Sequence, residues 1–170
     1  MSSPGNPAQR FAYDGKMRHY WVPQDGIANP AAPTAAELTA EGVFDFSKYI
    51  PKTGGVTGDP TQNYVDSGDI TDTFDSQQVG TYGFQPTIEA FRQDPDDNFA
   101  DFFATTKKGY WVNIFNGDDD SPKDGDRANV MLVENHIAVP LPATTNEKQR
   151  CRVGMAVLEE PYWNVSIVAS

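Results

Sequence analysis

The chain has little of the side-chain chemistry from which metal sites and common active sites are built. Its 170 residues include one cysteine, Cys151, and two histidines, His19 and His136. A single cysteine excludes a disulfide within this sequence. No His-Glu-x-x-His, Cys-x-x-Cys or Gly-x-Ser-x-Gly sequence occurs, so the zinc and serine-hydrolase motifs with those spacings are absent. We expect each histidine to be a packed or surface residue rather than a ligand.

Long apolar runs and a surplus of basic residues are missing too. No stretch of about 18 apolar residues occurs, so we expect no membrane insertion. The start, Met-Ser-Ser-Pro-Gly-Asn-Pro, lacks the apolar segment of a secretory signal, and a reducing cytoplasm is the simplest place of synthesis. The Pro, Gly and Ser content of this start predicts a flexible arm over residues 1–10, followed by a single domain over residues 11–170.

The formal net charge of −11 originates in the middle of the chain. Residues 1–52 hold five basic and five acidic side chains, and residues 127–170 hold four of each. Residues 53–126 hold four basic and fifteen acidic side chains, which accounts for the whole excess. A region of this charge repels phosphate, which argues against tight DNA binding through it. The alternative interpretation is that these acids only keep the protein soluble.

What the chain does have is a series of strand-like segments separated by turns, which its 14 glycines and 13 prolines favour. Aromatic, β-branched or alternating residues mark the expected strands. These strands cover residues 17–22, 63–65, 84–91, 110–115, 130–139, 148–158 and 163–168. The acidic segment 66–83 is either a long excursion or a weakly apolar hairpin. Pro86 predicts that the 84–91 strand lies at a sheet edge.

The alternation over residues 148–158 is the cleanest in the chain. It places Gln149, Cys151, Val153, Met155 and Val157 on one face, and Lys148, Arg150, Arg152 and Gly154 on the other. The three tryptophans, Trp21, Trp111 and Trp163, all lie in strand patterns. We therefore expect all three to build the core rather than line a sugar-binding groove.

Two short helices are predicted. The first covers residues 34–40, because Thr34 and Glu37 have the spacing of a capping box and Gly42 follows. The second begins with Asp94 as the cap and Pro95 in the first turn. Phenylalanines then recur at helical spacing, at positions 99, 102 and 103. The predicted fold class is therefore mainly β: an antiparallel β-sandwich or partly open barrel with one or two short flanking α-helices.

Carboxylates are abundant, but no pattern assembles them into a site. The loop 118–126 has a proline and a lysine where the fifth and sixth positions of a calcium-binding EF-hand loop would fall, and the sixth must be glycine. A weak, exposed cation site in this loop is the remaining alternative to a solvated loop. Nothing brings two carboxylates together as a glycoside hydrolase requires. No catalytic, cofactor-binding or metal-ligating residue is therefore predicted.

One series of segments has a familiar order. It begins with Tyr-Trp-Val-Pro at 20–23, Asn-Pro-Ala-Ala-Pro-Thr-Ala-Ala-Glu-Leu at 29–38 and Asp-Phe-Ser-Lys-Tyr-Ile at 45–50. It continues with Gln-Asn-Tyr-Val-Asp at 62–66, the 84–91 strand, the Phe-rich helix and Gly-Tyr-Trp-Val at 109–112. The 153–158 strand, a Pro-containing turn and the 163–168 strand close it. In this order the chain resembles the major tail proteins of bacteriophages with long, non-contractile tails (siphovirus type), the subunits of the tail tube.

The resemblance implies a structural virion protein that is not an enzyme and needs no cofactor. It implies a homo-oligomer of stacked, usually hexameric rings, built in the host bacterial cytoplasm into a hollow tube. Neighbouring subunits would join strands into an inner barrel, which resolves exposed sheet edges. The expected partners are the tape-measure protein in the lumen, and tail terminator and distal tail proteins at the tube ends. Double-stranded DNA would pass through the lumen without adhering, because an acidic wall repels phosphate.

On this interpretation the acidic middle of the chain has two roles. Candidate lumen-facing acids are Asp66, Asp69, Asp72, Asp75 and Glu89. The candidate contact loop, at the outer surface or between rings, contains Asp118, Asp119 and Asp120. The amino-terminal arm and long loops are expected to bridge successive rings.

Two alternatives remain open from the sequence. One is a β-sandwich module that binds carbohydrate on a virion or a cell surface, which requires exposed aromatic side chains and a monomer or trimer. The other is a carboxylate-based hydrolase, which requires a cleft holding a carboxylic acid of raised pKa. The hydrolase is disfavoured because no constellation of residues can be named for it.

Overall fold

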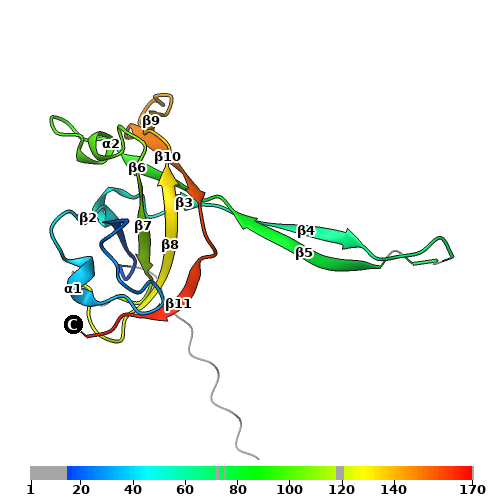
Figure 1. Ribbon diagram of the computed structural model, residues 1–170. Helices are drawn as coiled ribbons and strands as arrows, with labels where there is room; N and C mark the ends of the chain where they lie inside the picture. The colour runs from blue at the N-terminus through cyan, green and yellow to red at the C-terminus, as the bar shows by residue number, and fades with distance from the viewer. Residues whose placement is uncertain (1–14, 72, 75, 118–120, 170) are drawn as a thin grey trace, which may run out of the picture. The chain divides into compact units, whose positions relative to one another are not determined.

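The computed structural model describes residues 15–71, 73–74, 76–117 and 121–169, and it is rich in strands (Figure 1). The elements are β1 (Arg18–Pro23), α1 (Ala35–Leu38), β2 (Phe44–Asp45), η1 (Ser47–Tyr49), β3 (Val56–Thr57), β4 (Pro60–Asp66), β5 (Gln77–Phe84), β6 (Thr87–Phe91), α2 (Asn98–Phe102), β7 (Lys108–Ile114), β8 (Arg127–Asn135), β9 (Val139–Pro140), β10 (Arg150–Val157) and β11 (Tyr162–Ser166). The registered strand pairs are antiparallel. The predicted mainly β, antiparallel fold with short helices is confirmed.

The chain divides into two compact units. Unit 1 combines Met1–Ser47, Tyr110–Met131 and Pro161–Ser170, and unit 2 combines Lys48–Gly109 and Leu132–Glu160. The arm predicted over residues 1–10 falls outside the described residues. The single domain predicted over residues 11–170 stays a prediction.

Unit 1 holds β1, β2, most of β7, the first half of β8, and β11, which pairs with β8. Its core joins alternate residues of β1, β7 and β8 to α1. The members are Tyr20, Val22, Ile27, Leu38, Val112, Ile114, Ala128, Val130 and Ile167. The capping box of α1 is confirmed: Glu37 N donates to Thr34 Oγ1 (3.2 Å), and Thr34 N donates to Glu37 Oε2 (2.8 Å). The helix is shorter than predicted, because its last turn closes at Thr39.

A histidine is packed inside unit 1. The His19 side chain is 4% exposed, stacks on Phe46 with 5.8 Å between ring centroids, and accepts a hydrogen bond at Nδ1 from Trp111 Nε1 (3.3 Å). Burial lowers the pKa of His19 to about 4, although the charge of Asp45 opposes this shift. His19 is thus a neutral core residue, and the first of the two positions expected from the sequence, packed rather than on the surface, is the correct one.

Unit 2 holds the end of β8 and the strands β10, β6 and β3, with β9 on β10. Ile88 and Ala90 of β6 and Cys151, Val153 and Met155 of β10 are buried, as the alternation in the sequence predicted for β10. The prediction that Pro86 marks an edge is wrong. β6 lies between β10 and β3, and Pro86 sits just before β6 begins, where its missing N–H costs no ladder hydrogen bond.

The second helix begins later than predicted. Asp97, not Asp94, is the N-cap of α2, and its Oδ1 accepts from Ala100 N (3.4 Å). Arg92 Nε donates to the other oxygen of Asp97 (2.7 Å), which holds the cap in place. This start buries Phe99 and Phe103 against each other, with 4.9 Å between their ring centroids.

Trp163 is the one tryptophan placed wrongly from the sequence. Trp21 and Trp111 are 2% and 1% exposed, whereas Trp163 is 47% exposed. The cause is a bulge in β11: its register shifts between Tyr162 and Val165, and Asn164 adopts a φ of 54°. The extra residue reverses the alternation before Val165 and directs Trp163 to the surface.

Candidate assembly surfaces

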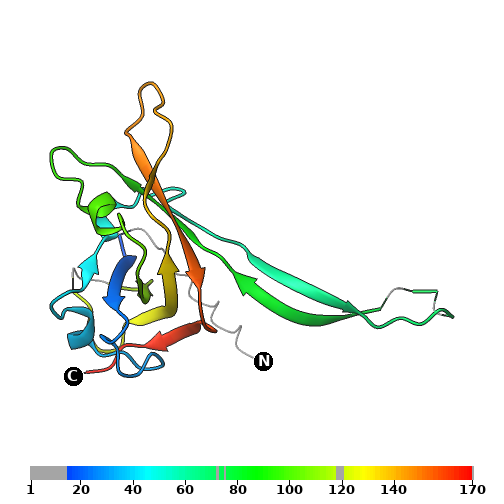
Figure 2. The ribbon, with the colours of Figure 1, turned by 45° about the horizontal axis from the view of Figure 1, so that its top comes forward.

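The hairpin β4–β5 is separate from the other strands of unit 2. The two strands form a sheet of their own and pair with no third strand among the described residues. Figures 1 and 2 show them extending beyond the other strands of unit 2. An isolated two-stranded hairpin is marginally stable in water. Of the two sequence alternatives for residues 66–83, the hairpin is correct.

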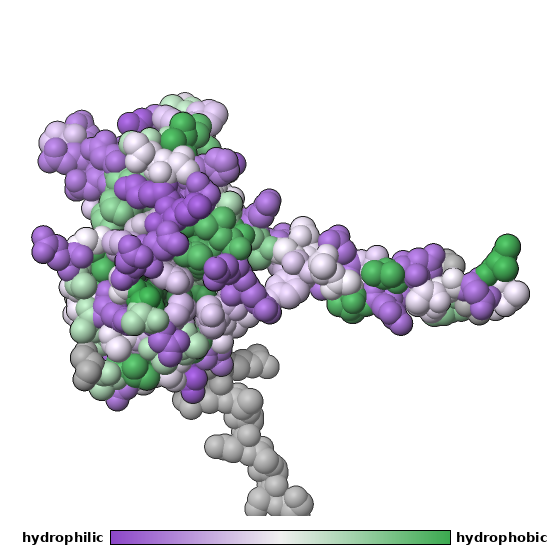
Figure 3. Space-filling view, in the orientation of Figure 1, coloured by the Kyte–Doolittle hydropathy of each residue, from purple (hydrophilic) through white to green (hydrophobic). Residues whose placement is uncertain are grey.

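The two faces of this hairpin differ in polarity. Directly paired residues share a face, so the register assigns one face to Pro60, Gln62, Tyr64, Asp66, Gln77, Val79, Tyr82 and Phe84, which we call the hairpin face. Tyr64, Val79 and Tyr82 on this face are 60%, 73% and 48% exposed. The opposite face carries the polar residues Thr61 and Gln78 beside one exposed valine, Val65 (56% exposed), and Asn63 Nδ2 there donates to Thr81 Oγ1 (2.9 Å). Figure 3 shows hydrophobic side chains on the hairpin that no other segment covers in that view.

A bulge keeps the hairpin face continuous. The register shifts between the pairs Gln62–Tyr82 and Tyr64–Val79, which places an extra residue in β5. Gly80 lies in this shift, and a Cβ there would come within 3.0 Å of the Asn63 carbonyl oxygen. Because glycine allows this close approach, Tyr82 and Val79 both remain on the hairpin face.

Of the candidate lumen acids that the structure describes, Asp66 and Asp69 lie on the hairpin and Glu89 lies on another strand. Asp66 ends β4, and its Oδ1 accepts from Gly68 N (3.1 Å). Asp69 lies in the turn beyond β4, where its Oδ1 accepts from Thr71 N (2.8 Å). Glu89 lies instead on β6. Asp72 and Asp75 lie outside the described residues, as do Asp118, Asp119 and Asp120 of the candidate contact loop.

The described part of the acidic loop 116–126 is anchored at its end. Asp126 is buried, and its Oδ2 accepts from Lys123 N (3.0 Å). Arg127 N donates to Asn116 Oδ1 (2.6 Å). Across the described residues no cluster of three or more His, Cys, Asp or Glu side chains has the arrangement of a metal site.

Glu89 belongs to a second surface of unit 2, formed by β6, β9 and β10. Register pairs put Arg152 beside Glu89 and Val139, and Arg150 beside Phe91. We call the face carrying these residues and Lys148 the cationic face. Val139 is 52% exposed, and the side chains of Arg152 and Arg150 are 53% and 34% exposed.

Contacts within the cationic face fix its side chains. Arg152 Nη2 lies 2.5 Å from Glu89 Oε1, and Arg150 Nη1 lies 3.7 Å from Glu89 Oε2. The Arg150 guanidinium carbon and Lys148 Nζ lie 5.4 Å and 5.6 Å from the centroid of the Phe91 ring. One carboxylate therefore faces two arginines, and the face retains a net positive charge. The alternation over residues 148–158 had already placed these basic residues together.

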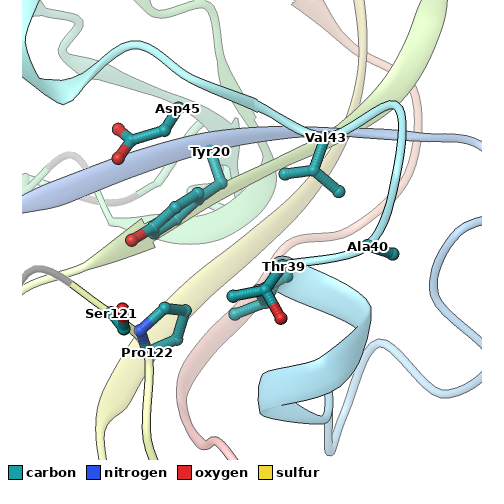
Figure 4. A pocket seen from close by; sticks show the side chains of 8 residues that line it. Tyr20, Thr39, Ala40, Val43, Asp45, Ser121 and Pro122 are labelled. Atoms are coloured by element: carbon teal, nitrogen blue, oxygen red, sulfur yellow. The ribbon is translucent and has the colours of Figure 1, made fainter.

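A cavity in unit 1 does not resemble an active site. Its volume is about 210 Å³, and Tyr20, Thr39, Val43, Asp45 and Pro122 are among its lining residues (Figure 4). Among the lining residues, Asp45 alone carries a carboxylate. Its Oδ1 accepts hydrogen bonds from Ser47 N (2.9 Å) and Ser47 Oγ (2.5 Å). General acid–base catalysis by a pair of carboxylates would need a second carboxylate, and the lining residues include none besides Asp45. No helix among the described residues has both the length and the apolar character needed to span a membrane.

Comparison with known proteins gives the family. The model of a family described as phage tail tube protein matches residues 6–170. A chain in the six-fold symmetrised cryo-EM structure of the anti-feeding prophage baseplate has a similar fold, with a TM-score of 0.51 and 10% sequence identity over 94% of this chain and 95% of that chain. No curated protein matches the sequence. The match to the family model spans nearly the whole sequence, and the chain therefore belongs to the phage tail tube protein family, whose members are structural virion components and not enzymes.

Proposed function

We propose that the protein forms hexameric rings that stack into the hollow tube of a long, non-contractile phage tail. The observation that carries this proposal is the hairpin β4–β5, whose hairpin face is exposed in the single subunit. Exposed apolar surface of this kind marks protein–protein interaction sites. In a member of the tail tube family, a neighbouring subunit is the natural partner for it.

The proposed ring symmetry draws support from the similar fold in the anti-feeding prophage baseplate, whose structure is six-fold symmetrised. Short edge strands such as β2, β3 and β11 leave backbone groups on one side for pairing. We propose that neighbouring subunits join strands into an inner barrel around the lumen.

The lumen of the tube is proposed to be acidic, so that DNA slides through it during ejection. Candidate wall residues are Asp66, Asp69, Asp72, Asp75 and Glu89. The charge of Glu89 is offset by Arg150 and Arg152, which makes the hairpin aspartates the stronger candidates. The tape-measure protein would occupy the lumen before the DNA, and terminator and distal tail proteins would bind the ends of the tube after assembly in the host cytoplasm.

Electron microscopy of the purified protein tests the proposal. Rings or tubes with a central hole and six-fold class averages are expected. Rings of another symmetry would overturn the hexamer alone. A monodisperse monomer at high concentration would contradict self-assembly, and a monomer or trimer that binds glycans would favour the carbohydrate-binding alternative, for which Trp163 is an exposed aromatic residue.

A further inference from the structure

The hairpin face has a specific electrostatic character. From Thr53 to Phe91 the sequence contains no lysine or arginine, whereas it contains six acidic residues. Asp66 lies on the hairpin face itself, two residues after Tyr64 on the same strand. A surface that binds this face must therefore combine apolar contacts with positive charge, since a desolvated carboxylate needs a cationic partner.

The cationic face of unit 2 has both properties. Val139 and Phe91 supply apolar area, and Lys148, Arg150 and Arg152 supply positive charge, of which Glu89 offsets only part. Residues of one face repeat about every 7 Å along a strand. When two strand faces pack against each other, side chains with this spacing can meet in pairs. Tyr64 can then contact an apolar side chain of the cationic face while Asp66 contacts a cationic one.

We propose that the cationic face is the docking surface for the hairpin face of a second copy of this chain. The inference rests on the proposed function and deepens it, because it names the surface that receives the hairpin. Charge complementarity between the purely acidic hairpin and the cationic face carries the argument. It reassigns Asp66 from the lumen wall to a contact between subunits.

A nucleic acid fits the cationic face less well than the hairpin does. Glu89 lies between Arg150 and Arg152 and binds both, which leaves less positive charge for a phosphate backbone. The exposed Val139 beside these charges matches an apolar side chain rather than a phosphate. An acidic, apolar strand from another subunit uses both components of the surface.

Cysteine cross-linking between two single variants tests the contact. The natural Cys151 is 1% exposed, so the background from it is low. Asp66→Cys is mixed with a larger, tagged Lys148→Cys protein, allowed to assemble and oxidised. The inference expects a heterodimer joined by a disulfide. The matched control is Lys108→Cys, because Lys108 is also exposed in unit 2 but lies on β7, outside the cationic face.

Charge exchange gives a second readout. Asp66→Lys and Lys148→Glu are each expected to raise the protein concentration needed for assembly about tenfold. The double variant is expected to assemble at a concentration close to that of the wild-type protein, because it restores an opposite-charge pair. Circular dichroism checks that each variant folds. Tubes without the Asp66–Lys148 cross-link, or with equal cross-linking to Lys108→Cys, would overturn the inference while the proposed function stands. A wild-type protein that never assembles would overturn both.

Discussion

At the scale of the residue, His19 carries the clearest consequence of burial. Its ring is 4% exposed and accepts a hydrogen bond from Trp111 at Nδ1. A proton on Nδ1 would place two donors face to face and bring a charge into the core. The pKa of His19, lowered from 6.5 to about 4, expresses that cost.

We predict that folding stability falls as the pH drops from about 6.5 to about 4. In this range the unfolded chain binds a proton at His19 and the folded subunit does not, so stability rises with pH across it. A shift of this size corresponds to about 3 kcal/mol. Urea unfolding of His19→Gln between pH 4 and 7 should show a smaller dependence of stability on pH than the wild-type protein shows. Equal profiles for the two proteins would contradict this role of His19.

The tryptophans give a second prediction at this scale. Trp111 is 1% exposed and Trp163 is 47% exposed, so Trp111→Ala should lower the free energy of unfolding by about 3–5 kcal/mol. Trp163→Ala should lower it by less than about 1 kcal/mol. Denaturant unfolding followed by far-UV circular dichroism measures both. A similar loss for the two variants would mean that the bulge in β11 does not place Trp163 at the surface.

At the scale of the element, features set by neighbouring residues were predicted correctly more often than the ends of helices and strands. The capping box at Thr34 and the alternation of β10 depend on neighbours in sequence, and both were predicted. The start of α2 depends on which aspartate becomes the cap, and Asp97 is held there by a side-chain contact from Arg92. The exposure of Trp163 depends on a bulge in β11 against β8. The spacing of apolar residues in a single segment specifies neither feature.

The two candidate assembly surfaces also combine local and long-range features. The basic residues of the cationic face follow from the alternation over 148–158, but their neighbours Glu89 and Val139 come from other strands. The hairpin was one of two alternatives, because its apolar residues are sparse and a bulge at Gly80 interrupts the alternation of β5. The separation of the hairpin from the other strands depends on tertiary structure, so the sequence pattern did not predict it.

The hairpin itself should contribute little to the stability of the subunit. Pro60 and Phe84 are paired at its base, so residues 61–83 can be replaced by a two-residue Gly-Gly turn. The free energy of unfolding should change by less than about 1 kcal/mol, because the described hairpin residues are mostly exposed. Urea unfolding of the shortened protein measures this. A loss of several kcal/mol would show that the hairpin belongs to the core of unit 2.

At the scale of the whole molecule, the charge and the apolar surface have to be read together. The net charge of −11 opposes close association of subunits through electrostatic repulsion, while the hairpin exposes Tyr64, Val79 and Tyr82. The proposed assembly satisfies both, because it covers the hairpin face and leaves acidic side chains around its channel. The central claim is that self-assembly proceeds through the hairpin face.

Sedimentation velocity over a concentration series tests this claim most directly. It compares wild-type protein with Tyr64→Thr/Val79→Thr, which changes the hairpin face, and with Thr61→Ala/Gln78→Ala, which changes the opposite face. The account predicts that the wild-type and opposite-face proteins sediment as large particles. Electron micrographs of the same samples should show a central hole in these particles. The hairpin-face variant should remain a folded single subunit at the same concentrations. Assembly of the hairpin-face variant at wild-type concentrations would contradict the account.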